Sequence, residues 1–254
     1  MRNLVLAALL GLSVLACKKD ENNNNNNNTQ PQFGKAILEF EHKWGSSPFT
    51  IPTAQPVTNI GGEALNFSMF NYYISNIEWI AVDGSVYSVP ESYHLFKLGS
   101  QSTLELELEN IPAKTYSGMR FTIGVDSTRN VSGAQEGALS PAEGMFWSWN
   151  SGYIFLKTEG QSNGTDFAYH IGGFRNANKT NALQEVSYLF PLPLQITSTA
   201  TPELHQMVHV EKMFDGPGME LRVSQNPRVT MPGMNAVNIS KNYVEMFELE
   251  HIHN

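Results

Sequence analysis

Cysteine is almost absent from this sequence, which contains only Cys17 among its 254 residues. A single thiol excludes an intramolecular disulfide, a cysteine-based zinc site and a cysteine-ligated iron–sulfur cluster. Basic residues are also scarce, because 16 lysines and arginines stand against 24 aspartates and glutamates, for a formal net charge of −8. Binding to nucleic acid or to an anionic membrane surface needs a basic footprint, so neither is expected.

A long hydrophobic run is missing as well. The apolar run from Leu4 to Ala16 is thirteen residues long, whereas a membrane-spanning helix needs about 20. It ends at Ala16-Cys17, which resembles a bacterial lipobox. Residues 1–16 are therefore interpreted as a lipoprotein signal peptide, and Cys17 as the lipidated anchor that holds the chain on the membrane. The alternative is an ordinary secretory signal with a coincidental cysteine.

A polar tether follows the expected anchor. Residues 17–32 contain Lys18-Lys19-Asp20-Glu21 and seven consecutive asparagines. This composition has too little apolar surface to enter a core, so a flexible linker is expected. The charged residues after Cys17 resemble export signals of surface lipoproteins in some Gram-negative bacteria. The expected location is the cell envelope, as an outer-membrane lipoprotein that is periplasmic or surface-exposed.

Residues 33–254 have the pattern of one β domain. The expected strands are 36–42, 66–82, 86–89, 93–98, 103–109, 120–125, 145–157, 166–174, 185–196 and 206–213. In the segment Thr103–Glu109, leucines alternate with glutamates, which predicts one buried face and one face in water. One helix is expected from Lys241 to about Phe247, with Ser240 as its N-cap. The predicted fold is an all-β, antiparallel Greek-key β-sandwich with one short C-terminal helix.

Common enzyme motifs are missing. The sequence has no G-x-S-x-G, no H-E-x-x-H, no P-loop and no G-x-G-x-x-G after a strand. No residue is singled out as catalytic, and the protein is not expected to be an enzyme. The segment 126–144, poor in apolar residues, is expected to be a long loop, and loops of that length are usually functional or disordered.

Histidines are the main candidate metal ligands, because neutral imidazole is the commonest metal ligand in proteins. In an extended segment, His251 and His253 lie on one face about 6.6 Å apart, so both rings can reach one ion. The alternative is a C-terminal tail with two solvated histidines. His205 and His209 form a second, weaker pair on an expected strand.

Two further histidines and two tryptophans are candidate residues of a metal or ligand site. His42 ends the first expected strand and His170 lies within another, where a single histidine is more often a hydrogen-bonded core or rim residue than a ligand. Trp147 and Trp149 project on one face if their segment is a strand. They are interpreted either as sandwich core or as aromatic walls beside a ligand or metal.

A family resemblance rests on the segment Gly137–Gly160, which contains Trp-Ser-Trp-Asn-Ser-Gly-Tyr. This segment resembles the signature of the MbnP-like copper-binding family, the methanobactin-associated periplasmic proteins and their lipoprotein relatives. Supporting stretches lie at 70–77, 121–126 and 167–174, together with the opening 38–42 and the closing 246–253. The resemblance covers nearly all of residues 34–254.

The resemblance implies a secreted β-sandwich in which histidines hold copper together with a tryptophan oxidised to kynurenine. A partner di-haem enzyme of the MauG type performs that oxidation in characterised relatives. Trp147 and Trp149 match the tryptophan motif, and the resemblance does not say which of them is modified. His42 and His170 match histidine positions of relatives. His251 and His253 match a His-x-His ending of lipoprotein relatives.

The expected copper site therefore combines four histidines of the domain. Its expected ligands are His251 and His253 with His42 and His170, beside Trp147 or Trp149. The ion would be captured, stored or delivered. Some relatives carry paired cysteines in the mature domain, and this chain has none. The alternative function is a surface lipoprotein module whose aromatic face binds a glycan or a protein, without metal.

Overall fold

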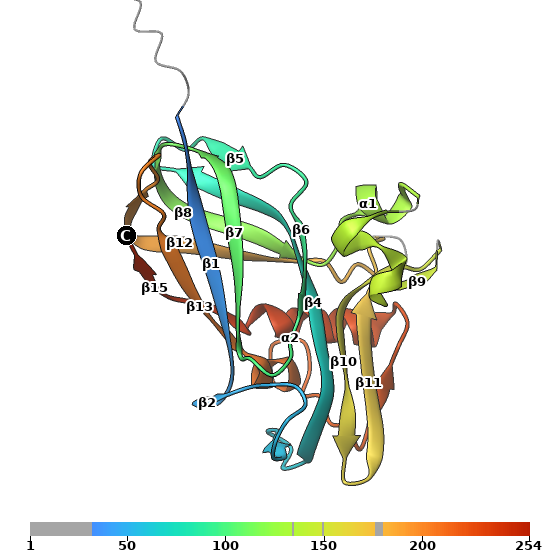
Figure 1. Cartoon of the computed structure of the whole chain (residues 1–254). Helices are drawn as coiled ribbons and strands as arrows, with labels where there is room; N and C mark the ends of the chain where they lie inside the picture. The colour runs from blue at the N-terminus through green and yellow to red at the C-terminus, as the bar shows by residue number, and fades with distance from the viewer. Residues whose placement is uncertain (1–31, 134, 149, 176–179) are drawn as a thin grey trace, which may run out of the picture. The chain divides into compact units, whose positions relative to one another are not determined.

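The inner faces of two β-sheets enclose the hydrophobic core (Figure 1). The structure is a computed structural model that describes residues 32–133, 135–148, 150–175 and 180–254. The predicted all-β sandwich with a short C-terminal helix is confirmed. The predicted sites at Cys17 and Trp149 lie outside the described residues.

The smaller sheet has the strand order β15-β13-β1-β2, and β7 also pairs with β1. Its strands are β1 (Phe33–Trp44), β2 (Ser47–Pro48), β7 (Thr103–Pro112), β13 (Glu203–His209) and β15 (Phe247–His253). β1 runs parallel to β13 and antiparallel to β7. Figure 1 shows β15, coloured dark red, beside β13 at the edge of this sheet.

The larger sheet has the order β12-β8-β4-β10-β11-β14, with β3, β5 and β6 paired to β4, and β9 paired to β10. Its strands are β3 (Val57–Thr58), β4 (Ala64–Ala81), β5 (Val86–Ser88), β6 (Tyr93–Lys97), β8 (Thr115–Ile123), β9 (Phe146–Ser148), β10 (Gly152–Ser162), β11 (Thr165–Gly172), β12 (Gln184–Gln195) and β14 (Arg228–Val229). β11 and β14 are parallel, so both sheets are mixed, with one parallel pair each among the described strands.

Alternation along β1 determines what the smaller sheet presents to each side. Every second side chain of β1 is buried, namely Ala36, Leu38, Phe40 and His42. The ring of Phe40 packs edge-on against Phe96 of β6 and Phe121 of β8, which joins the two sheets. Glu39 and Glu41 point to the other side, so the outer face of this sheet is polar. The predicted alternation of leucines and glutamates in β7 is confirmed by its burial pattern.

The C-terminal helix begins earlier than predicted. α2 spans Met234–Val244, so Ser240 lies inside the helix and is not its N-cap. The Ser240 hydroxyl donates a hydrogen bond to the carbonyl of Val237, at 2.7 Å, which is the local bond by which serine fits within a helix. Among the described residues, no helix is long and apolar enough to cross a membrane.

Two other expectations are corrected in the middle of the chain. The strand predicted over 145–157 is divided into β9 and β10, which pair antiparallel across a turn closed by a hydrogen bond from the amide of Ser151 to the carbonyl of Ser148. Gly152, the first residue of β10, takes a positive φ of 77°. A Cβ atom at Gly152 would lie 2.0 Å from Oδ1 of Asn130, so only glycine fits there. In its described residues, the segment predicted as a long loop folds into three short helices, α1 (Ser127–Val131), η1 (Gly137–Leu139) and η2 (Pro141–Glu143). Asp126 caps α1 by accepting from the backbone amides of Thr128 and Arg129.

Candidate metal centre

Three histidines converge on the outer face of the smaller sheet. His205 of β13 lies directly opposite His251 of the antiparallel strand β15, and His253 follows two residues later on β15. Side chains two apart share a face of a strand, and directly opposite residues bring their Cβ atoms within about 5.5 Å. Strand pairing therefore brings one imidazole from β13 and two from β15 to one point.

A bulge in β15 turns the two C-terminal histidines to this face. Phe247 and Leu249 pair with Val208 and Gln206, whereas His251 pairs with His205, so Glu250 is an extra residue in the ladder. Without the extra residue, His251 would share the inward direction of Phe247 and Leu249, because side-chain directions alternate. Bulges of this kind redirect side chains next to functional sites.

The ring geometry is compact. Nε2 of His251 and Nε2 of His253 are 3.1 Å apart. The ring centroids of His205 and His251 are 4.3 Å apart with nearly parallel planes, and those of His205 and His253 are 4.9 Å apart. One candidate ligand atom from each of the three residues lies within 4.8 Å of the others. We call these three residues the three-histidine centre.

Carboxylates surround the inner member of this centre. Nδ1 of His205 lies 3.2 Å from Oε1 of Glu39, which is its Cα partner on β1. Nε2 of His205 is 4.0 Å from Oε2 of Glu203 and is buried without a hydrogen-bond partner. Desolvation raises the pKa of the Glu39 carboxyl, and the carboxyls of Glu203 and Glu105 raise this pKa further against the lowering effect of His205. The free protein thus concentrates negative charge beside three imidazoles, an arrangement that favours a bound cation.

His42, a predicted ligand, lies elsewhere. Its side chain is fully buried on the inner face of β1, whereas His205 is on the outer face of the same sheet. Nδ1 of His42 donates to the carbonyl of Ser102 at 2.7 Å, so in the neutral ring Nε2 accepts from the hydroxyl of Tyr72 at 3.0 Å. Burial lowers the pKa of His42 to about 4. Both ring nitrogens are occupied, and the structure does not bring His42 to His251 and His253.

His170 and Trp147 lie together, but on the larger sheet. His170 of β11 contacts Oε1 of Glu159 through Nε2 at 2.7 Å, and burial lowers its pKa. Trp147 packs over Gly172, where a Cβ atom would lie 2.9 Å from the indole. Gly172 is two residues after His170, so the indole and the imidazole share one face of β11. The structure therefore does not bring His170 or Trp147 to the three-histidine centre.

Sequence reasoning undervalued three residues of this site. His205 was expected only in a second pair with His209, and Glu39 and Glu203 were not singled out. His209 instead lies at the far end of β13, where its Nε2 is 3.3 Å from Oε2 of Glu248. The pattern Glu203-x-His205 was a usable signal, because both side chains share a strand face with the spacing of His251-x-His253.

With this geometry established, comparison with known proteins identifies the family. The model of the MbnP family matches residues 34–232. The chain belongs to the MbnP family. The solved structure of MbnP from Methylosinus trichosporium has the same fold, with a TM-score of 0.54 and 14% sequence identity over 81% of this chain and 87% of that chain. No curated protein matches the sequence.

The MbnP family match does not cover the whole candidate centre. It includes Glu39, Glu203 and His205, and it also includes His42 and His170. It ends before α2 and β15, so His251 and His253 lie outside it. Membership of the MbnP family therefore predicts the sandwich, and the strand that completes the three-histidine centre is a separate observation.

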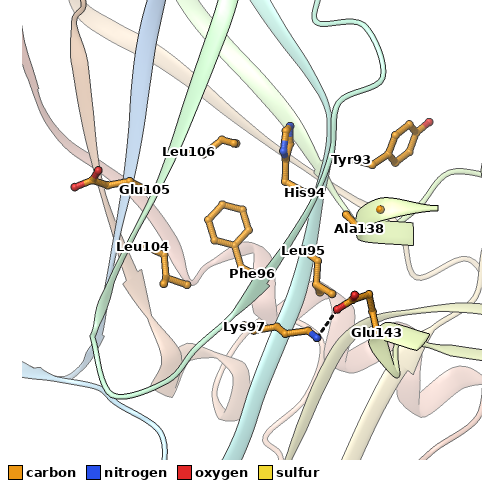
Figure 2. A pocket seen from close by; sticks show the side chains of 11 residues that line it. Tyr93, His94, Leu95, Phe96, Lys97, Leu104, Glu105, Leu106, Ala138 and Glu143 are labelled. Carbon is orange, nitrogen blue, oxygen red and sulfur yellow. Dashed lines mark hydrogen bonds and ion pairs between the residues drawn. The ribbon is translucent and has the colours of Figure 1, made fainter. Parts of the chain in front are cut away.

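The MbnP-family sandwich also has a pocket of about 520 Å³ between the unpaired edges of β6 and β7 (Figure 2). Leu95, Leu104 and Leu106 form apolar walls, and Lys97 pairs with Glu143 at 2.5 Å on the rim. His94 projects into this region, and its Nε2 is buried without a hydrogen-bond partner. Burial lowers the pKa of His94. Among the described residues, no group of candidate metal ligands gathers in this pocket.

Proposed function

We propose that this chain is a cell-envelope lipoprotein that binds copper at His205, His251 and His253. The observation that carries the proposal is the convergence of three imidazoles from two adjacent strands, with candidate ligand atoms within 4.8 Å of one another. Imidazole suits copper, and divalent copper binds nitrogen and oxygen ligands more tightly than the other first-row divalent metals. Membership of the MbnP family supports copper as the metal, because the sequence resembles copper-binding proteins of that family.

The position of the centre suits reversible uptake and release of an ion. β15 is an edge strand, and His251 and His253 are exposed on it. An ion bound there is reached directly from solvent, so it exchanges without opening of the core. Capture and delivery of copper therefore fit this site better than long-term storage in the interior.

The copper site is tested by removing its exposed half. In the variant His251→Ala/His253→Ala, two of three imidazoles are lost, so binding of about one equivalent of Cu(II) to the wild type is expected to disappear. Equilibrium dialysis followed by metal analysis measures the loss. His209→Ala removes a histidine of β13 that lies outside the centre and is expected to bind like the wild type. Unchanged affinity in the double variant would place the copper elsewhere, and no binding by the wild type would refute copper binding altogether.

The lipid anchor is the second part of the proposal, and it rests on the short apolar run that ends at Ala16-Cys17. Cys17→Ser removes the thiol that carries the lipid, so the protein is expected to move from the membrane pellet to the soluble fraction of lysed cells. Lys19→Ser, which keeps the cysteine, is the matched control and should stay with the membrane. A Cys17→Ser protein that still sediments with membranes would contradict the anchor.

A further inference from the structure

A second group of candidate metal ligands shares His205 with the three-histidine centre. β13 lies between β15 and β1, so His205 faces His251 on one side and Glu39 on the other. Glu203 precedes His205 by two residues and shares its face of the strand. One carboxylate oxygen of Glu39, one of Glu203 and one ring nitrogen of His205 lie within 4.8 Å of one another, and this group does not include His251 or His253. We call these three residues the two-carboxylate site.

The distances and donor atoms of the two-carboxylate site suit a hard divalent ion. Nδ1 of His205 is 3.2 Å from Oε1 of Glu39, and Nε2 of the same ring is 4.0 Å from Oε2 of Glu203. For bonds of about 2.1 Å at right angles, two neighbouring ligand atoms on one ion lie about 3 Å apart. Carboxylate oxygens suit ions such as Mn(II), whereas imidazole nitrogens suit copper. All three side chains are partly exposed, so water can complete the coordination of an ion.

The two carboxylates of this site lack the basic partner that neighbouring carboxylates have. On the same sheet face, Glu41 and Glu107 each pair with a lysine, at 3.3 Å and 2.9 Å. Within the described part of the chain, no lysine or arginine pairs with Glu39 or Glu203. Two carboxylates this close repel each other when both are ionised. A divalent ion would supply one positive charge for each of them.

We infer that Glu39, Glu203 and His205 form a second cation site for a hard divalent ion such as Mn(II), and that this site and the three-histidine centre are occupied in alternation. His205 belongs to both groups, and a neutral imidazole has one lone pair to give to a metal. It therefore ligates one ion at a time, whichever ring nitrogen it uses. The two-carboxylate site itself does not depend on copper, whereas the alternation rests on the proposed copper binding. Copper that binds on the side of β15 thus expels the hard ion held on the side of β1.

Binding of Mn(II) to the mature protein tests the two-carboxylate site. The electron paramagnetic resonance signal of hydrated Mn(II) is lost on binding and measures the bound fraction. Glu39→Gln/Glu203→Gln keeps the size of both side chains and is expected to weaken binding by more than about ten-fold, since loss of even an outer partner of a metal has that effect. Glu41→Gln/Glu107→Gln removes two carboxylates from the same sheet face and should change the affinity by less than about three-fold, because exposed charges are screened.

Thermal unfolding of the metal-free proteins establishes that these variants are folded. The single variant Glu203→Gln is measured as well, so that the result does not depend on folding of the double variant. No Mn(II) binding by the wild type would overturn the two-carboxylate site. Wild-type affinity in folded Glu39→Gln/Glu203→Gln would overturn it too.

The alternation is tested by adding copper to the wild type loaded with Mn(II). Copper is expected to release Mn(II) one for one, as measured by equilibrium dialysis and analysis of both metals. His251→Ala/His253→Ala keeps the two-carboxylate site and should still bind Mn(II), but half-release should need at least about ten-fold more copper, because two of three imidazoles are lost. Mn(II) and copper bound together on one wild-type chain would overturn the alternation. Equal release in His251→Ala/His253→Ala would overturn it as well, since copper would then displace Mn(II) at the carboxylates directly.

The second site and the proposed function can fail separately. Binding of Mn(II) that is lost in Glu39→Gln/Glu203→Gln, by a chain that binds no copper, would leave the two-carboxylate site in place and refute the proposed function. Copper binding that requires His251 and His253, by a chain that binds no Mn(II), would do the reverse.

Discussion

Replacing Asn242 by alanine is expected to lower the free energy of unfolding by about 4 kcal/mol, which is large for one side chain. Asn242 is fully buried in α2, and its amide makes four hydrogen bonds to backbone. Nδ2 donates to the carbonyls of Met213 and Met219, and Oδ1 accepts from the amides of Gly218 and Met219. Alanine leaves all four backbone groups without these partners, and each buried unsatisfied group costs about 1–3 kcal/mol.

The segment that Asn242 binds lies tightly against α2. A Cβ atom at Gly218 would lie 1.9 Å from the carbonyl oxygen of Asn238, so the segment passes against the backbone of α2. Denaturant unfolding measures the loss, which should appear in a thermal scan as a midpoint about 10 °C lower. Asn235→Ala is the matched control, because Asn235 is an exposed asparagine of the same helix. A shift in Asn242→Ala no larger than in Asn235→Ala would show that the amide network carries no stability.

Acidification from pH 7 to pH 4 is expected to destabilise the protein by about 3 kcal/mol through His42 alone. Burial lowers the pKa of His42 from 6.5 to about 4 in the folded chain. Below pH 6.5 the unfolded chain therefore binds a proton that the folded chain refuses. Stability from this residue is complete above pH 6.5 and is lost as the pH falls toward 4. Each pKa unit of difference corresponds to about 1.4 kcal/mol.

A variant that cannot titrate isolates this contribution. His42→Gln retains a donor for the carbonyl of Ser102 and an acceptor for the hydroxyl of Tyr72, the two partners of the native ring. Urea unfolding of both proteins at pH 7, 5.5 and 4 gives two pH profiles in which all other groups are the same. The wild type should lose about 3 kcal/mol more than the variant over this range. Parallel profiles would mean that His42 is protonated in the folded protein.

The strands were the most predictable part of this chain, because their signal is local. In β7, alternation of leucine and glutamate identified both the strand and its buried face. The limits of α2 were misjudged because Ser240 resembles an N-cap, whereas its hydroxyl is used inside the helix. The start of β10 packs against Asn130, which is distant in the sequence, and the amide of Tyr153 donates to Oδ1 of Asn130. Such contacts leave no local pattern.

Of the candidate centre, the local part could be predicted and the part that depends on strand pairing could not. The spacing of His251 and His253 on an extended segment was sufficient to nominate them, and β15 is a strand. His42 and His170 were expected beside them, whereas the structure places His205 there, because the neighbour depends on which strand lies beside β15 and on the bulge at Glu250. His42 shows why. Side chains of β1 alternate between the core and the outer face, so a shift of one residue along the strand would move His42 from one face to the other.

The parallel pairing of β1 with β13 has a consequence for the order of events in folding. Glu39 and His205 are direct Cα partners although 166 residues separate them in the chain. Contacts between such distant residues form slowly, because the entropy of closing the loop must be overcome first. The centre also needs β15, which pairs with β13 near the end of the domain. A nascent or half-folded chain therefore offers no complete three-histidine centre, so under the proposed function metal loading would follow folding, and copper binding would report that the domain has closed.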